Sequence, residues 1–320
     1  MKWGNVKVGD CCEVTSSKRI FFSEYVDSGV PFYRSKEIIE SSNGQAISEP
    51  LFISQEKYDE IKNHFGVPQS GDMLLTSVGT IGVPYIVRKK DYFYFKDGNL
   101  TWFRNFSDEL DSKYLYFWVK SSEGQSVLNN TTIGSSQKAL TIASLKGLEI
   151  PCPPAPVQKR IVEFLAGYDD LIENNQKQIK LLEEAAQRLY KEWFVDLRFP
   201  GYETTPIVDG IPQGWERMVL SEVTSVLKRG ISPKYSDNGK YSVINQKCIR
   251  SSIMDISESR RQEKEYVPTL NLQDSDTVIC STGTGTLGRV GRVYGDYPNT
   301  TFDSHVTLVR AKENPNYIYH

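Results

Sequence analysis

The chain has 320 residues, of which 39% are hydrophobic and 24% are charged. This ordinary globular composition is long enough for two or three domains, and it excludes a disordered, collagen-like or fibrous protein. The 38 Lys and Arg against 40 Asp and Glu give a formal charge of −2, so binding to nucleic acid would need local basic patches or a basic partner.

The amino terminus and the cysteines predict a cytoplasmic protein without a bound metal. The first residues contain no apolar run of signal-peptide length, and no segment approaches the roughly 18 apolar residues of a membrane span. Five cysteines include one adjacent pair and no CxxC, which is typical of reduced, buried thiols. Only three histidines accompany them, none at metal-ligand spacing from a cysteine.

Residues 1–155 have the pattern of a mixed α/β (α+β) domain. Short β-branched and aromatic runs alternate with Gly, Asn, Asp and Ser; residues 73–75 precede a glycine loop and residues 85–87 follow it. Such runs predict strands of a mostly antiparallel sheet. Residues 114–119 have helical character and lead to a polar loop at 129–138.

Residues 156–199 predict one long helix. The proline-rich stretch before them ends the first domain, because its prolines cannot continue a helix. Apolar residues then recur at alternating steps of four and three. These seam positions are Ile161, Leu165, Tyr168, Ile172, Asn175, Ile179, Leu182, Ala186, Leu189 and Trp193.

This heptad seam predicts packing against a partner helix, with Asn175 setting the register. About 40 residues would give a rod of about 60 Å. The alternative is a long core helix inside one globular domain, but a compact domain rarely spans that length, so we expect the helix to join two bodies.

Residues 200–320 repeat the first segment in the same order. The run that opens at Trp3 matches the run at Trp215, the glycine loop that follows Gly71 matches the one that follows Ser275, and Tyr114-Leu-Tyr matches Tyr317-Ile-Tyr. The sequence therefore predicts a second copy of the first domain that is incomplete at its carboxyl end.

Three short motifs suggest chemistry that we do not expect here. Gly283-Thr-Gly-Thr-Leu-Gly288 matches a dinucleotide-binding pattern, but a strand-like alternation follows it where that site needs a helix. Asn314-Pro-Asn-Tyr lacks the second proline of the amino-methyltransferase signature, so we expect Asn314 to cap a helix. Ser135-x-x-Lys lacks the companion motifs of serine acyl enzymes. No catalytic set can be assembled, and the chain is expected to be non-catalytic.

The candidate binding residues lie in polar loops and basic clusters at matched places in the two copies. Small and hydroxyl residues there let backbone groups approach phosphates, Lys and Arg supply charge, and amides can read base edges. The predicted DNA-binding residues are Lys18, Arg19, Arg34, Lys36, Ser77, Gly79, Thr80, Gln137 and Lys138 in the first copy, and Lys228, Arg229, Lys234, Gln246, Lys247, Ser281 and Gly283 in the second.

Together these features resemble the DNA-specificity subunit of type I restriction-modification enzymes. Both copies open with Trp-x-x-x-x-Leu/Val and carry a Ser-x-Gly-Thr-type loop, and Pro151-Cys-Pro-Pro precedes Gln158-x-x-Ile at the start of the long helix. The resemblance covers nearly the whole chain and implies two target recognition domains joined by a spacer helix. Each domain would read a few base pairs of a bipartite site in the major groove.

The resemblance also implies partners and cofactors. The partners would be double-stranded DNA, methyltransferase (M) subunits that use S-adenosylmethionine on adenine N6, and restriction (R) subunits that use ATP and Mg. This chain itself would bind no cofactor. Because a second spacer helix is absent, we expect a shortened subunit whose seam pairs between two chains or stays open.

Two other classes remain as alternatives. A coiled-coil scaffold or adaptor would have partners but no dependence on DNA. An enzyme that uses the second glycine loop would bind a nucleotide, and Gly285→Val would abolish that binding. Calorimetric titration with NAD or ATP separates this last class from the others.

Overall fold

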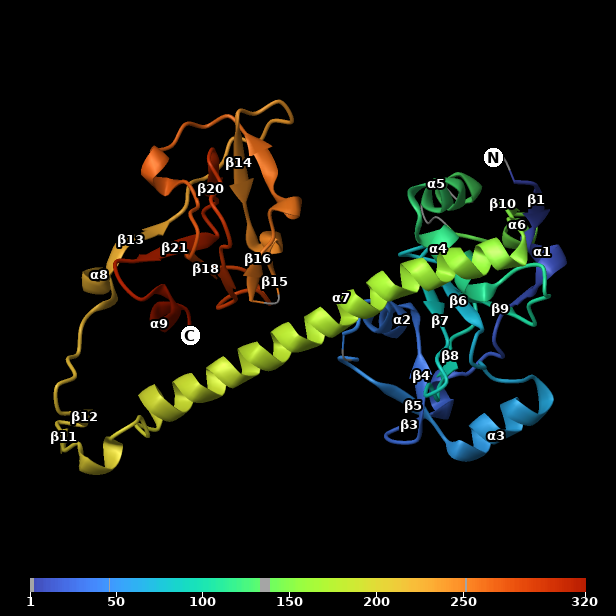
Figure 1. The fold of residues 1–320 in the computed structure, drawn as a ribbon, viewed down its shortest axis with the longest axis horizontal. Helices are drawn as coiled ribbons and strands as arrows, with labels where there is room; N and C mark the ends of the chain where they lie inside the picture. The colour runs from blue at the N-terminus through green and yellow to red at the C-terminus, as the bar shows by residue number, and fades with distance from the viewer. Residues whose placement is uncertain (1–2, 46, 133–138, 251) are drawn as a thin grey trace. The chain divides into compact units, whose positions relative to one another are not determined.

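The computed structural model describes residues 3–45, 47–132, 139–250 and 252–320, and its chain divides into two compact units (Figure 1). The first unit ends at Gln178 and the second begins at Ile179. This boundary lies inside the long helix α7 (Ala155–Tyr190), so each unit includes part of the helix. The predicted mixed α/β class and the predicted long helix are both confirmed.

The first unit contains two four-stranded sheets and a short β-ribbon. One sheet has the order β2 (Glu13–Thr15), β9 (Leu100–Arg104), β6 (Met73–Thr76) and β7 (Pro84–Ile86), all antiparallel. The other has the order β3 (Tyr25–Val26), β5 (Leu51–Ile53), β4 (Val30–Tyr33) and β8 (Tyr94–Phe95), with β4 and β8 parallel. The ribbon pairs β1 (Asn5–Lys7) with β10 (Glu149–Pro151).

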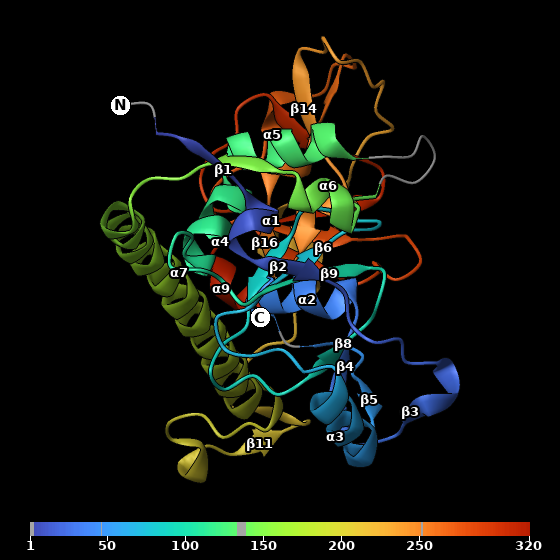
Figure 2. The same cartoon turned by 90° about the vertical axis from the view of Figure 1, so that its right-hand side faces the viewer.

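The helices of the first unit cover these sheets. They are α1 (Val8–Cys11), α2 (Ser35–Ser42), α3 (Gln55–His64), α4 (Ser112–Lys120), α5 (Ser122–Thr131) and α6 (Ile142–Lys146). Helix α3 lies beside the β3-β5-β4-β8 sheet, at the opposite end of the unit from α5 and α6 (Figure 2). Strand β6 is buried on both faces, because Met73 and Leu75 belong to one apolar cluster while Leu74 belongs to another.

The second unit has a six-stranded sheet and a three-stranded sheet. The larger has the order β13 (Thr224–Arg229), β21 (Val306–Ala311), β18 (Thr277–Cys280), β19 (Val290–Arg292), β16 (Ile253–Met254) and β15 (Ile249–Arg250). The smaller has the order β17 (Arg260–Gln262), β14 (Tyr241–Ile244) and β20 (Thr300–Phe302). A hairpin of β11 (Ile207–Val208) and β12 (Ile211–Pro212), and the helices α8 (Leu220–Val223) and α9 (Pro315–Tyr319), complete it.

The two units repeat one topology, as the sequence repeat predicts. The order β2-β9-β6-β7 in the first unit corresponds to β13-β21-β18-β19 in the second, and β5-β4-β8 corresponds to β17-β14-β20. In the second of these corresponding orders the last pair is parallel in both units: β4 with β8, and β14 with β20. Most other strand pairs are antiparallel, including the long-range pairs β2–β9 and β13–β21.

Helix α7 is amphipathic, and its apolar stripe is exposed. Near its start, Val162 and Gln158 are buried against the first unit, where the Gln158 side chain donates to the Glu109 carbonyl at 2.8 Å. The predicted seam begins at Ile161, which packs against the core of the first unit, but further along the helix Tyr168, Ile172 and Leu182 are exposed, Leu182 by 70%. In the second unit the stripe continues to Tyr190, and residues Lys191–Val195 then form a π-helical turn.

Three further expectations concern the cysteines, metal binding and membrane-spanning helices. All five cysteines are free, and four of them are buried; burial raises the pKa of Cys12 to about 12. The described residues include no group of His, Cys, Asp and Glu placed to bind a metal ion. Among the helices in the described ranges, none combines the length and apolarity needed to cross a membrane.

Candidate nucleic-acid interface

In each unit three strands end close to one another, and polar residues follow each of these strand ends. In the first unit, the Lys96 N–H after β8 donates to the Tyr33 carbonyl at 2.8 Å, and the Ser77 N–H after β6 donates to the Asn99 carbonyl at 2.8 Å. These bonds bring the residues that follow β4, β6 and β8 together. Predicted residues Arg34 and Lys36 follow β4, and the predicted glycine loop at Gly79 and Thr80 follows β6.

The second unit repeats this arrangement. The Asp303 N–H after β20 donates to the Ile244 carbonyl at 2.9 Å, and the Ser281 N–H after β18 donates to the His305 carbonyl at 2.8 Å. The Gln246 side-chain amide donates to the Thr282 carbonyl at 2.6 Å. The structure therefore brings Gln246 next to Ser281 and Gly283.

Ser77 and Ser281 each connect their glycine loop to a neighbouring strand. Ser77 is buried, and its hydroxyl lies 2.7 Å from the Thr101 hydroxyl on the neighbouring strand β9. Ser281 and Thr307 form the same pair in the second unit. Both hydroxyls are thus engaged within the fold, so the phosphate contact predicted for them would have to come from other loop atoms.

The glycines allow the loops to turn. Gly79 and Gly82 have φ of +79° and +80°, and Gly283 has φ of +111°, a left-handed region that favours glycine. A Cβ at Gly283 would also collide with the side chains of Gln246 and Thr286. The loop leads into strand β19, as the alternating pattern after it predicts, and not into the helix that a dinucleotide-binding fingerprint needs.

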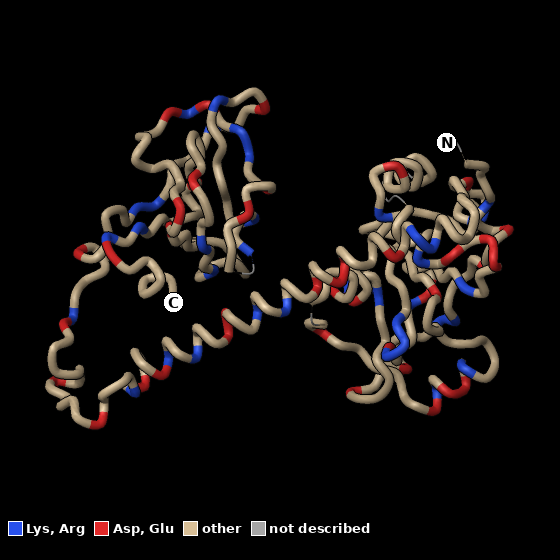
Figure 3. The backbone as a smooth tube through the Cα atoms, viewed as in Figure 1, with Lys and Arg blue, Asp and Glu red and all other residues tan. Residues whose placement is uncertain are grey.

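Many of the predicted basic residues are neutralised by nearby carboxylates. Four ion pairs do this: Arg19 with Asp97 at 2.8 Å, Arg34 with Glu37 at 2.5 Å, Lys36 with Glu49 at 2.8 Å, and Lys234 with Glu263 at 2.9 Å. Figure 3 shows the same mixing of signs within each unit and along α7. The local basic patches are therefore weaker than the count of Lys and Arg indicates.

The remaining predicted cations lie at the surface without a carboxylate within ion-pair distance in the described residues. The Lys18 ammonium sits 4.8 Å from the centre of the Phe65 ring. Lys228 and Arg229 are exposed at the end of β13, and the Arg229 guanidinium donates to the Ser304 carbonyl beside the β20 end. Lys247 is exposed next to Gln246. Gln137 and Lys138 lie outside the described residues.

Arg34 has a second, structural role. The Glu37 carboxylate is fully buried and accepts hydrogen bonds from the Arg34 backbone N–H and guanidinium. Burial opposes ionisation of this carboxyl, but its bonds with Arg34 outweigh burial and hold its pKa below the ordinary value. Arg34 thus stabilises the start of α2.

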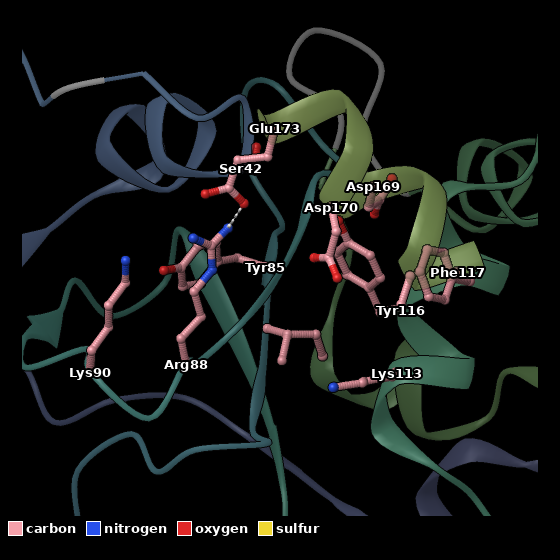
Figure 4. A pocket seen from close by; sticks show the side chains of 12 residues that line it. Ser42, Tyr85, Arg88, Lys90, Lys113, Tyr116, Phe117, Asp169, Asp170 and Glu173 are labelled. Carbon is pink, nitrogen blue, oxygen red and sulfur yellow. Dashed lines mark ion pairs between the residues drawn. The ribbon is translucent and has the colours of Figure 1, made fainter. Parts of the chain in front are cut away.

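A cleft of the first unit lies where α7 passes β7 and α4 (Figure 4). Arg88 and Lys113 project from one side and Asp169, Asp170 and Glu173 from α7 on the other; the Arg88 guanidinium pairs with Glu173 at 3.6 Å. Opposite charges face each other here, so the cleft does not suit an anionic ligand. The Arg88–Glu173 pair instead links the residues after β7 to α7.

Sequence reasoning missed three charged residues at the strand ends. Lys96 directly follows β8, Asp303 directly follows β20, and Arg260 stacks on Tyr235 at 3.6 Å from the ring centre. The sequence repeat could have indicated the first two, because Phe95 and Phe302 precede them at matched positions. Asn314 caps α9 as predicted, since its side chain accepts from the Tyr317 N–H at 3.3 Å.

Comparisons with known proteins add independent findings. A family model described as type I restriction modification DNA specificity domain matches residues 1–184. The MjaIX specificity subunit of a type I restriction enzyme from Methanocaldococcus jannaschii is 29% identical over 274 residues, which cover 78% of this chain and 60% of that protein. A putative type I specificity subunit of Haemophilus influenzae, S.HindORF215P, is 29% identical over 188 residues, or 58% of this chain and 45% of that protein.

The fold also matches a solved structure. The crystal structure of an S subunit from a type I restriction-modification system of M. genitalium superimposes with a TM-score of 0.54 at 15% identity, covering 100% of this chain and 76% of that chain. At this identity the match concerns the fold alone. The chain spans about half to three-fifths of the length of the curated relatives named above.

Proposed function

This chain belongs to the type I restriction-modification DNA specificity family, and from that membership we propose that it reads a bipartite site in double-stranded DNA for a multi-subunit enzyme. Each unit reads one half of the site with the loops at its converging strand ends. Helix α7 fixes the gap between the halves. The chain itself is non-catalytic.

The observation that carries this proposal is the duplicated loop site. The same strands end together in both units and are held by the same backbone hydrogen bonds, while the side chains around them differ. Loops on a fixed scaffold are the usual place for recognition residues. Two such sites on one chain suit a target with two unlike halves.

The proposed partners are those that the family implies, and the exposed stripe on α7 and the mixed charge are compatible with them. Methyltransferase subunits with S-adenosylmethionine dock on the helix and close around the DNA, and restriction subunits with ATP and Mg join them. Alternatively, two copies of the chain associate through their seams and cover the exposed stripe of α7. Basic surfaces on such partners would supply phosphate contacts that this chain, at a charge of −2, provides only sparsely.

Purification of the tagged full chain from its native host tests the proposal. Mass spectrometry should find an adenine methyltransferase subunit in the eluate, with or without an ATP-dependent translocase. A tagged, unrelated protein from the same host serves as the control. Recovery of neither subunit in repeated purifications would contradict the assembly.

Lys18→Ala and Arg19→Ala should each weaken DNA binding by the assembled complex at all sequences alike. The logarithm of the association constant falls linearly with the logarithm of the salt concentration, and each lost phosphate contact makes this slope less steep by about 1. We expect the smaller effect for Arg19, because Asp97 already offsets its charge. Fluorescence anisotropy over a salt series measures both slopes.

Lys159→Ala is the matched control for these two variants, because Lys159 is an exposed cation on α7, outside both loop sites. Its slope should equal that of the wild type. Unchanged slopes for Lys18→Ala and Arg19→Ala would exclude both residues from the DNA surface.

A further inference from the structure

A polar pocket of the second unit opens at the ends of β14 and β20. Asn245, Gln246, Arg260 and Asp303 line it together with Tyr235. Asp303 is only 3% exposed, and its Oδ1 accepts the His305 backbone N–H at 2.9 Å. Within the described residues no donor reaches its other oxygen, Oδ2. Oδ2 is not one of the fully enclosed polar atoms without a partner among the described residues, so it reaches the pocket as an acceptor that a ligand can engage.

The walls of the pocket are fixed in place. The Gln246 amide is bonded to the Thr282 carbonyl at 2.6 Å, and the Asn245 side chain accepts the Lys247 N–H at 2.8 Å. The Arg260 guanidinium carbon lies over the Tyr235 ring, 3.6 Å from its centre. Burial raises the pKa of the Asp303 carboxyl, although the His305 N–H opposes this. Polar groups held in this way are preorganised for recognition.

The first unit has a residue of opposite character at the equivalent place. Tyr33 pairs with Phe95 in the parallel β4–β8 ladder, and Ile244 pairs with Phe302 in β14–β20. The next residue, Lys96 or Asp303, then donates its N–H to the facing carbonyl in both units. The backbone is the same, whereas the side chain is a hydrogen-bond donor in one unit and an acceptor in the other.

We propose that Asp303 is a specificity-determining residue that accepts a hydrogen bond from the exocyclic amino group of a cytosine or an adenine in bound duplex DNA. This inference rests on the DNA-reading function proposed above and assigns one base contact to it. Carboxylates accept from the amino group of cytosine in the major groove, and adenine N6 presents the same kind of donor there. Lys96 offers a donor in the first unit, so the two units discriminate different bases at this position.

The test is selection of binding sites from a randomised duplex library by the full chain assembled with its methyltransferase partner. The wild type should enrich cytosine or adenine at one position of one half-site. Asp303→Asn keeps the size of the side chain and an oxygen for the His305 N–H, but it adds an amide donor that faces the base amino group. Preference at that single position should fall at least about tenfold, with all other positions unchanged.

Asp237→Asn is the matched control, since it removes the same charge from an exposed residue of the same unit. Asp303→Ser, smaller and still able to accept, provides a second variant if the amide perturbs folding. An analogue test needs no change to the protein. Replacing the selected cytosine by 2-pyrimidinone, or the selected adenine by purine, should weaken wild-type binding about tenfold and leave Asp303→Asn binding unaffected.

The outcomes separate this inference from the function on which it rests. Loss of preference at one position in Asp303→Asn, together with the analogue effect, supports the base contact. A wild-type complex that enriches a sequence while Asp303→Asn enriches the same one with equal preference overturns the contact alone. A wild-type complex that enriches no sequence overturns the DNA-reading function and this contact together.

Discussion

Arg310→Ala should lower the free energy of unfolding of the second unit by about 3–5 kcal/mol. The Asp276 carboxylate is fully buried, and the Arg310 guanidinium bonds both of its oxygens at 2.7 Å. The same guanidinium also donates to the carbonyls of Thr269 and Asn271. Alanine leaves the buried charge without its partner and two carbonyls without a donor.

Urea unfolding followed by circular dichroism measures the loss, and hydrogen exchange of peptides covering β18 assigns it to the second unit. Arg250→Ala is the control, because Arg250 is exposed and its removal should cost under about 0.5 kcal/mol. Adding Asp276→Asn to Arg310→Ala should recover part of the stability, since it removes the uncompensated charge. Equal unfolding curves for Arg310→Ala and the wild type would contradict the assignment.

Leu182→Glu should abolish association of the chain with its helical partner while leaving the chain folded. Leu182 belongs to the seam of α7 and is 70% exposed, so a glutamate is tolerated in the free chain. In an assembled seam the same glutamate would be an unpaired buried charge. We expect affinity to fall at least about 100-fold, equivalent to about 3 kcal/mol.

Purification of the tagged variant from its host, beside the wild type, measures the loss of partner, and sedimentation measures any self-association. Gln187→Glu introduces the same side chain on the same helix at an exposed position away from the seam, and it should retain the partner. Equal unfolding midpoints of the three proteins show that folding is unaffected. A Leu182→Glu chain that recovers as much partner as the wild type would exclude the seam as the interface.

Local patterns in the sequence were sufficient to predict several elements. The apolar run at 73–75 forms β6, residues 85 and 86 lie in β7, and the heptad spacing gives α7. Each of these signals lies within one segment: an apolar run bounded by turn residues, or a period of three and four. The repeat predicted two copies of one module because equivalent segments keep their order along the chain.

Long-range contacts could not be predicted in the same way. The parallel pairs β4–β8 and β14–β20 join segments about 60 residues apart, and no local pattern specifies such pairing. Arg19 and Asp97 are separated by 78 residues, so the sequence alone indicated a free cation there. Ser77 was expected at the loop surface, but its packing under the loop depends on Thr101 from another strand.

The matched hydrogen bonds of Lys96 and Asp303 have an evolutionary consequence. The strand-to-strand bond at this position is made by the backbone N–H, which every residue except proline supplies. The Asp303 side chain adds one further local bond, from the His305 N–H, and the burial of its carboxylate offsets part of what that bond contributes. Mutation can therefore exchange this side chain at little cost in folding, and each half of the chain can acquire a new preference while the other keeps its own.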